Sequence, residues 1–170
     1  MKILATLIVA ALPFASLISC KTNSTGSLTP SEYTASNADF SGFASWSQTV
    51  SPRHGFDPSG VLSSGMAHGV NDSTITRTIY VKQPAATVDQ SGNYPVGTIF
   101  YKNLTMNGMT AMGTGMVKRG GTYNSSGRNW EYFMLGADGK IMARGDTLMG
   151  GMCQGCHSSA AAGHDYIFTK

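Results

Sequence analysis

A Cys-x-x-Cys-His motif at residues 153–157 constrains this chain more than any other feature of its sequence. Its two thiols lie one helical turn apart, so both can add to the vinyl groups of a haem while the following imidazole reaches the iron. A zinc site would need a second pair of ligands, and a redox-active dithiol would not need the histidine. The motif therefore predicts one covalent haem c on Cys153 and Cys156, with His157 as the iron ligand.

The opposite end of the chain predicts the compartment. Residues 1–19 combine Lys2, an apolar run and small residues before Cys20, as an export signal does. The residues around Cys20 resemble the lipobox of bacterial lipoproteins, which implies cleavage before Cys20 and its acylation; a plain secretory signal is the alternative. Lys21 favours the outer membrane. Because haem is attached to such a motif outside the cytoplasm, both ends predict a lipid-anchored protein on the periplasmic side of a bacterial membrane.

Composition limits the class of protein. The 170 residues leave material for one domain after export. With 12% charged residues and 21 glycines, the chain suits a turn-rich β protein better than a helical bundle. The net charge of +3 is too weak to suggest a nucleic-acid surface, so no nucleic-acid partner is expected.

Three segments are expected along the chain. A lipoprotein signal peptide occupies residues 1–19, and a lipidated flexible tether rich in Ser, Thr, Asn and Gly occupies residues 20–37. A single haem domain occupies residues 38–170. At its start, Asp39 is placed to cap a short helix bearing aromatic residues at three-residue spacing, Phe40, Phe43 and Trp46.

In most of the remaining domain, apolar residues recur at every second position. Residues 51–72, which include His54 and His68, are predicted to be loop. Alternating apolar residues then predict strands at 74–81, 98–104, 109–118, 130–135 and 140–143. Residues 152–162 are expected to form a short helix and residues 165–169 a closing strand or extended tail. The predicted fold is mainly β (α+β), an antiparallel sheet with a short N-terminal helix and a C-terminal helix carrying the motif.

A β-rich chain that ends in this motif differs from the helical cytochromes c and resembles the cytochrome P-460 family, which includes the β-type cytochromes c prime. The resemblance covers roughly residues 40–169. It rests on segments in a fixed order, namely residues 78–81, 95–102, 116–118, 129–133, 153–157 and 165–168.

The resemblance implies roles for two strand residues. In hydroxylamine-oxidising members the lysine that ends the Gly-Thr strand is covalently linked to haem, and the equivalent position is Lys102. The strand pattern alone places Lys102 on the same face as Phe100 and Leu104. That face can point either into the domain or to the solvent, so the Lys102 ammonium is either partly buried or solvated. The family's acidic distal residue falls at Thr114, whose hydroxyl cannot act as a carboxylate base. Asp72, Asp89 and Glu131 are other acidic candidates.

The resemblance also implies a substrate class and partners. We expect oxidation of a small nitrogen species, hydroxylamine or nitric oxide, with a soluble cytochrome as electron acceptor because one haem stores one electron. Homodimerisation is a family expectation. One alternative is a non-enzymatic binder of nitric oxide or carbon monoxide. Another is an electron-transfer cytochrome with an axial methionine, for which the candidates are Met109, Met112, Met116, Met149 and Met152.

Overall fold

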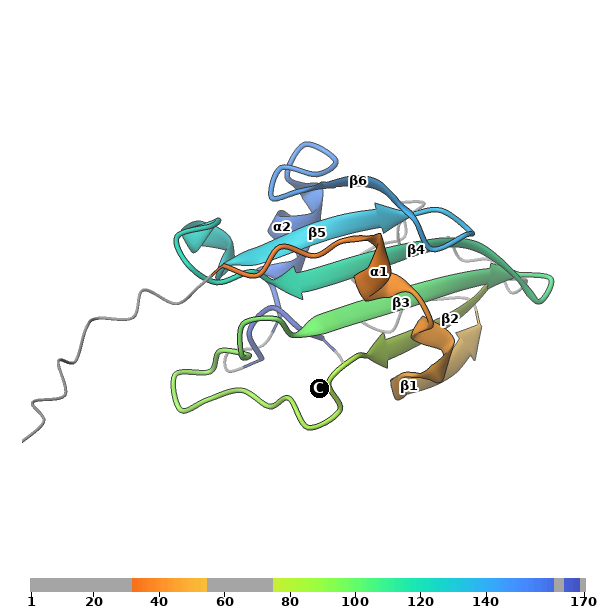
Figure 1. Cartoon of the computed structure of the whole chain (residues 1–170), viewed down its shortest axis with the longest axis horizontal. Helices are drawn as coiled ribbons and strands as arrows, with labels where there is room; N and C mark the ends of the chain where they lie inside the picture. Colours follow the sequence, from red (N-terminus) through yellow and green to blue (C-terminus); the bar gives the residue numbers. More distant parts are fainter. Residues whose placement is uncertain (1–31, 55–74, 161–163, 169–170) are drawn as a thin grey trace, which may run out of the picture.

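The computed structural model describes residues 32–54, 75–160 and 164–168. Within these residues the chain forms a six-stranded antiparallel sheet whose strands lie in chain order (Figure 1). The expected mainly β fold is therefore confirmed. The strands are β1 (Ser47–His54), β2 (Ile75–Val81), β3 (Ile99–Met106), β4 (Met109–Lys118), β5 (Trp130–Leu135) and β6 (Ile141–Gly145).

Both faces of this sheet are buried, each by a different end of the chain. Phe40, from the N-terminal segment, packs with Tyr101 and other alternate strand residues on one face. Phe100 and Met116 pack with residues of the C-terminal segment on the other. In Figure 1 the helix α1 (Asn37–Phe40) lies in front of the sheet and the helix α2 (Met152–His157) behind it. The sheet therefore separates an α1 face from an α2 face.

The first helix is shorter than predicted and is capped differently. Ser36, not Asp39, is the N-cap, and the Asp39 carboxylate accepts a hydrogen bond from the Ser36 N–H at 2.8 Å. Gly42, with φ of 70°, turns the chain before the 3-10 helix η1 (Phe43–Ser45) begins. The aromatic residues thus belong to two short helical turns and the residue after them, because the left-handed glycine interrupts the helix.

Two expected boundaries differ near the N-terminus. Residues 32–36, assigned to the tether from composition, lie against the folded domain: the Tyr33 N–H donates to the Arg119 carbonyl at 2.8 Å, and Ala35 is buried. Residues 51–54, predicted as loop and including His54, belong to β1 because they pair with β2. The signal segment, Cys20 and His68 lie outside the described residues.

The C-terminal prediction was wrong in its last element. The helix α2 ends at His157 with Ser158 as its C-cap. Residues 165–168 form a turn and no strand, because Asp165 and Tyr166 adopt left-handed φ values of 47° and 67°. The chain therefore turns back beside α2, and this turn becomes part of the site below.

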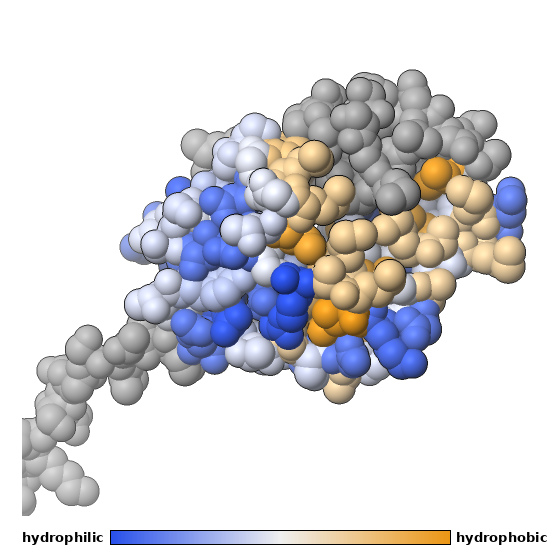
Figure 2. Space-filling model, turned by 90° about the horizontal axis from the view of Figure 1, so that it is seen from above, coloured by the Kyte–Doolittle hydropathy of each residue, from blue (hydrophilic) through white to orange (hydrophobic). Residues whose placement is uncertain are grey.

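The molecular surface is uneven in polarity. Figure 2 shows apolar side chains gathered over one part of the face in view, and hydrophilic side chains over another. Among the exposed apolar side chains are those of Met142 and Met152. In the part of the chain that the structure describes, no helix is both long enough and apolar enough to cross a membrane.

Candidate haem site

Three consecutive residues with left-handed backbone conformation precede the Cys-x-x-Cys-His motif and turn the chain back toward the sheet. Met149, Gly150 and Gly151 have φ values of 55°, 67° and 82°, and Gly151 is the N-cap of α2. Glycine adopts this conformation without steric cost, so the chain can reverse sharply before the helix. Cys153 and Cys156 then lie one helical turn apart, both half-buried and without a disulfide among the described residues, with His157 next to them. This is the spacing that two thioether bonds to one haem require.

Cys153 is partly buried and packs against the apolar core of the α2 face. Burial raises the pKa of its thiol, and the Lys102 ammonium offsets part of this rise. Thr114, directly opposite Lys102 across β3 and β4, lines a pocket together with Cys153, so Lys102 and Cys153 lie on the same side of the sheet. Lys102 therefore lies half-buried on the α2 face, the face that carries the motif.

The imidazole of His157 is fixed on three sides. Its Nδ1 lies 2.8 Å from the carbonyl oxygen of Tyr166. Its ring centroid is 5.6 Å from that of Tyr132 and 5.5 Å from that of Phe168. A carbonyl can only accept, so Nδ1 carries the proton and Nε2 is the ring nitrogen suited to iron. An iron-ligating histidine commonly has its other nitrogen held in this way.

The register of the sheet brings Lys102 and Thr114 together. They are directly opposed across β3 and β4, so their side chains share the α2 face. Thr114 also lines an open pocket that contains two residues of the motif. The pocket is lined by Thr114, Gly115, Met116, Tyr132, Phe133, Met134, Met149, Cys153 and His157.

A buried hydroxyl group also faces this region. Tyr132 is 2% exposed, and its hydroxyl has no hydrogen-bond partner within the described residues. Burial, followed by the nearby Cys153, raises the pKa of this phenol, so it stays protonated near neutral pH. A buried hydroxyl in this state favours a polar partner such as a haem substituent or an iron ligand. Together with the donor set of the motif, it fits a haem that Cys153, Cys156 and His157 would hold.

The charged residues of the α2 face are mainly basic. Arg77, which is 6% exposed, opposes Leu104 in the register and so joins Lys102 on this face. Glu131 lies on the α1 face, where its carboxylate binds Arg144 through contacts of 2.7 Å and 2.8 Å. Asp89 accepts hydrogen bonds from the backbone of its own exposed loop. Neither acidic candidate reaches the pocket, and Asp72 lies outside the described residues.

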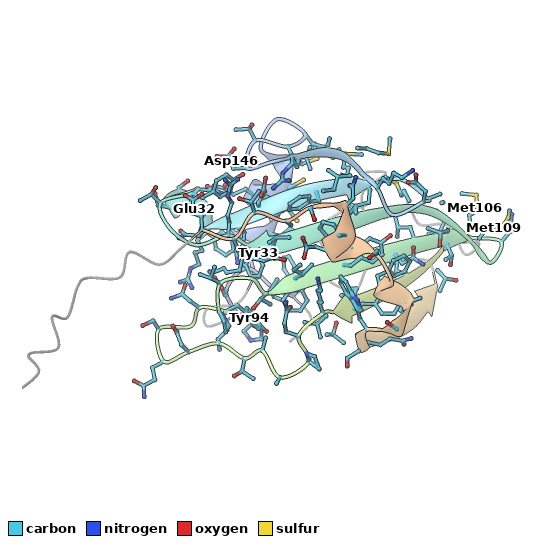
Figure 3. All side chains as sticks on the ribbon, in the orientation of Figure 1. Glu32, Tyr33, Tyr94, Met106, Met109 and Asp146 are labelled. Atoms are coloured by element: carbon cyan, nitrogen blue, oxygen red, sulfur yellow. The ribbon has the colours of Figure 1, made fainter. Side chains whose placement is uncertain are left out.

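The methionines separate into two groups. Met116 and Met149 line the pocket, as does Met134, which the sequence analysis did not single out. Met109 is 72% exposed at the tip of the β3–β4 hairpin, away from α2 (Figure 3). Met112 lies on the α2 face without lining the pocket, and Met152 is exposed on α2 itself. Met116 and Met149 therefore remain as candidates for an axial ligand.

Sequence reasoning missed the groups that hold the histidine. The acceptor for His157 is a backbone carbonyl, which no side-chain motif reveals. The turn that presents this carbonyl is tied down by a buried ion pair, in which Lys118 Nζ lies 2.7 Å from Asp165 Oδ2. Lys118 and Asp165 could have been singled out from the sequence, because both belong to the segments that resemble the cytochrome P-460 family.

The family comparison supports the same cofactor. A family model described as Cytochrome P460 matches residues 59–169, well over half of the chain. The chain belongs to the cytochrome P460 family. It is accordingly a haem protein, in keeping with the donor set on α2. No curated protein and no solved structure matches the chain.

Proposed function

We propose that this cytochrome P460 protein carries one haem c, attached by thioether bonds at Cys153 and Cys156 and ligated by His157. In each attachment the thiol adds across a vinyl group, so one carbon–sulfur bond forms, the proton goes to the other vinyl carbon and no oxidant is needed. The observation that carries the proposal is that these three residues occupy one turn of α2 while Tyr166 engages Nδ1 of the imidazole.

We propose further that the haem acts on a small nitrogen species, by oxidation of hydroxylamine or nitric oxide. Family membership supports this substrate class, and Lys102 lies on the same face as the motif, as a link to haem would need. When bound, the haem supplies the redox centre. A single haem takes up one electron between its common states, so a soluble cytochrome is the proposed electron acceptor.

Binding of nitric oxide or carbon monoxide without turnover is the second candidate function. The residue directly opposite Lys102 is Thr114, and its hydroxyl can donate a hydrogen bond to an iron ligand but cannot remove a proton near neutral pH. Met116 and Met134 add thioether groups to the same pocket. Among the described residues the pocket lining has no carboxylate, which favours ligand binding over proton-coupled oxidation.

An electron-transfer role is the third possibility, because Met116 and Met149 lie in the same pocket as His157. Axial methionine would give a low-spin haem that resists carbon monoxide, whereas an open sixth position would bind it. Absorption spectra of the reduced protein, with and without carbon monoxide, separate these cases.

For the location we propose a lipid anchor at Cys20 that holds the domain on the periplasmic side of a membrane, in accord with the export signal and lipobox-like sequence. Homodimerisation is part of the same proposal. Metabolic labelling with a fatty acid, compared between the natural chain and Cys20→Ala, tests the anchor.

Peptide mass mapping of the purified holo-protein tests the main proposal. We expect a haem-bearing peptide that contains Cys153 and Cys156, and loss of covalent haem in the Cys153→Ser/Cys156→Ser variant. A further link to the Lys102 peptide, absent in Lys102→Arg, would support hydroxylamine oxidation. Haem on the two cysteines alone would favour gas binding or electron transfer. A chain without covalent haem after export with maturation factors would refute the proposal.

A further inference from the structure

We infer that Asp165 is a positioning residue for the iron ligand: its buried carboxylate locks the C-terminal turn whose Tyr166 carbonyl orients His157. This inference rests on the proposed ligation of iron by His157. It assigns to a residue outside the Cys-x-x-Cys-His motif a part in setting the properties of the haem.

The carboxylate of Asp165 is the centre of a buried polar cluster. Its Oδ2 lies 2.7 Å from Lys118 Nζ and accepts a hydrogen bond from the Tyr94 N–H, also at 2.7 Å. Its Oδ1 faces the Arg128 guanidinium at 3.8 Å. The side chain of Asp165 is 0% exposed and that of Lys118 is 6% exposed. Such a pair is shielded from solvent and holds its partners in one geometry.

Three separate parts of the chain meet at this carboxylate. Lys118 ends β4, and Arg128 lies shortly before β5. Tyr94, labelled in Figure 3, belongs to the loop before β3. Lys118 Nζ also donates to the Arg128 carbonyl at 2.6 Å. The C-terminal turn is therefore fastened to the end of the sheet rather than to α2 alone.

Hydrogen bonds to backbone groups also hold the C-terminal turn. The Trp130 indole N–H donates to the Asp165 carbonyl at 2.8 Å, and the Ile167 N–H donates to the His164 carbonyl at 2.9 Å. Asp165 and Tyr166 both occupy the left-handed region, which is costly for residues other than glycine. Two such residues in succession persist because the surrounding contacts over-determine the turn.

The locked turn presents one backbone group to the haem ligand. The Tyr166 carbonyl lies 2.8 Å from Nδ1 of His157, and Phe168, two residues later, packs against the same imidazole. A hydrogen bond at Nδ1 fixes the ring orientation and makes Nε2 a stronger donor to metal. Asp165 therefore acts on the iron through the turn, without touching the histidine side chain.

The α1 face offers a matched control. Glu131 is 2% exposed and binds Arg144 through two contacts, so it is also a buried carboxylate paired with a cation. It lies on β5, as does Tyr132, but on the opposite face of the sheet and outside the His157 contacts. Its replacement tests the cost of losing a buried ion pair without loosening the C-terminal turn.

The experiment compares Asp165→Asn with Glu131→Gln in the holo-protein. The readouts are the iron–histidine stretching frequency in resonance Raman spectra of the reduced protein and the reduction midpoint potential. We expect both variants to unfold at lower temperature. Only Asp165→Asn should shift the stretching band to lower frequency and raise the potential, because a loosened hydrogen bond makes His157 a weaker donor.

A second variant covers the case in which Asp165→Asn does not fold. Lys118→Met/Asp165→Asn removes both charges at similar volume and leaves no buried charge unpaired. It should show the same two shifts. A natural chain that lacks haem or an iron–histidine band would overturn the proposed function and this inference together. A natural chain with that band, whose Asp165 variants match Glu131→Gln in both readouts, would overturn the inference alone.

Discussion

The Nδ1 atom of His157 lies 2.8 Å from the carbonyl oxygen of Tyr166, nine residues later in the chain. The acceptor is neutral, so the imidazole keeps its proton at Nδ1 and does not gain the anionic character that a carboxylate partner would give. A histidine with a fixed ring is a suitable single protein ligand for a haem whose other face binds a small molecule.

Added imidazole should reverse the effect of removing the His157 side chain. We expect His157→Ala to retain haem on its two cysteines and to lose the iron–histidine band, and added imidazole to restore the band by filling the vacated position. Resonance Raman spectra of the reduced variant check this. The control is His164→Ala, which removes an exposed histidine beside the same turn and should leave the spectrum unchanged. An unaltered band in His157→Ala would assign the ligand elsewhere.

Introduction of a carboxylate at position 114 should increase oxidation of hydroxylamine. Thr114 lines the pocket and directly opposes Lys102, so a glutamate there would share the pocket with Cys153 and His157. Because a positioned general base contributes roughly 10² to 10⁴-fold, we expect Thr114→Glu to raise the rate by about 10²-fold. Steady-state assays with an artificial electron acceptor measure it.

Thr110→Glu is the matched control, because Thr110 lies on the same strand near the hairpin tip and does not line the pocket. Its rate should equal that of the natural chain. Equal rates in both variants, each with a full complement of haem, would show that the missing carboxylate does not limit oxidation and would favour gas binding.

Much of the sheet could be predicted because period-two alternation is a local property. The predicted strand at 109–118 coincides with β4, and that at 130–135 with β5. The strand pattern also placed Lys102 with Phe100 and Leu104 on one face. It could not say which face is inward, because both faces of this sheet are buried and alternation then lacks its usual polar side.

The C-terminal turn could not be predicted for a different reason. Residues 165–168 contain aromatic and β-branched residues that suit a strand. Their conformation is decided by Lys118 and Trp130, which lie far away in sequence and contact Asp165 only after folding. The motif thus predicts the haem ligands, whereas the groups that orient His157 depend on long-range contacts that spacing does not encode.

Gly113 should resist substitution although it lies within a strand. A Cβ atom there would overlap the Tyr101 hydroxyl and come within 2.5 Å of Tyr101 Cζ, and Tyr101 is 0% exposed. Overpacking of this kind costs about 1–3 kcal/mol, so Gly113→Ala should lower the free energy of unfolding by that amount. Denaturant titration measures it.

Two variants sharpen this test. Tyr101→Phe in the Gly113→Ala background removes the hydroxyl but not Cζ, so it should restore only part of the loss. Gly155→Ala, whose added Cβ has no described atom within 4 Å, should not destabilise the protein. A Gly113→Ala protein as stable as the natural chain would contradict the close approach of Tyr101 to the strand.

The Asp39 carboxylate should make stability depend on acid pH. Burial raises its pKa, but hydrogen bonds from Tyr33, Ser36 and Lys82 outweigh this and hold the pKa of Asp39 well below its usual value near 3.8. A depressed folded-state pKa contributes stability that is present above the unfolded-state value and lost as pH falls through the folded-state value. The natural chain should therefore lose stability as the pH falls below about 4.

Asp39→Asn should lose about 1–3 kcal/mol at neutral pH, because its hydrogen bonds no longer end on a charge, and should show a shallower loss below pH 4. Urea titrations at several pH values measure both effects. Asp138→Asn is the control, since it breaks an exposed contact of 3.0 Å with Lys140 that solvent screens, and its effect should be small. Parallel pH profiles for Asp39→Asn and the natural chain would show that another carboxylate governs acid unfolding.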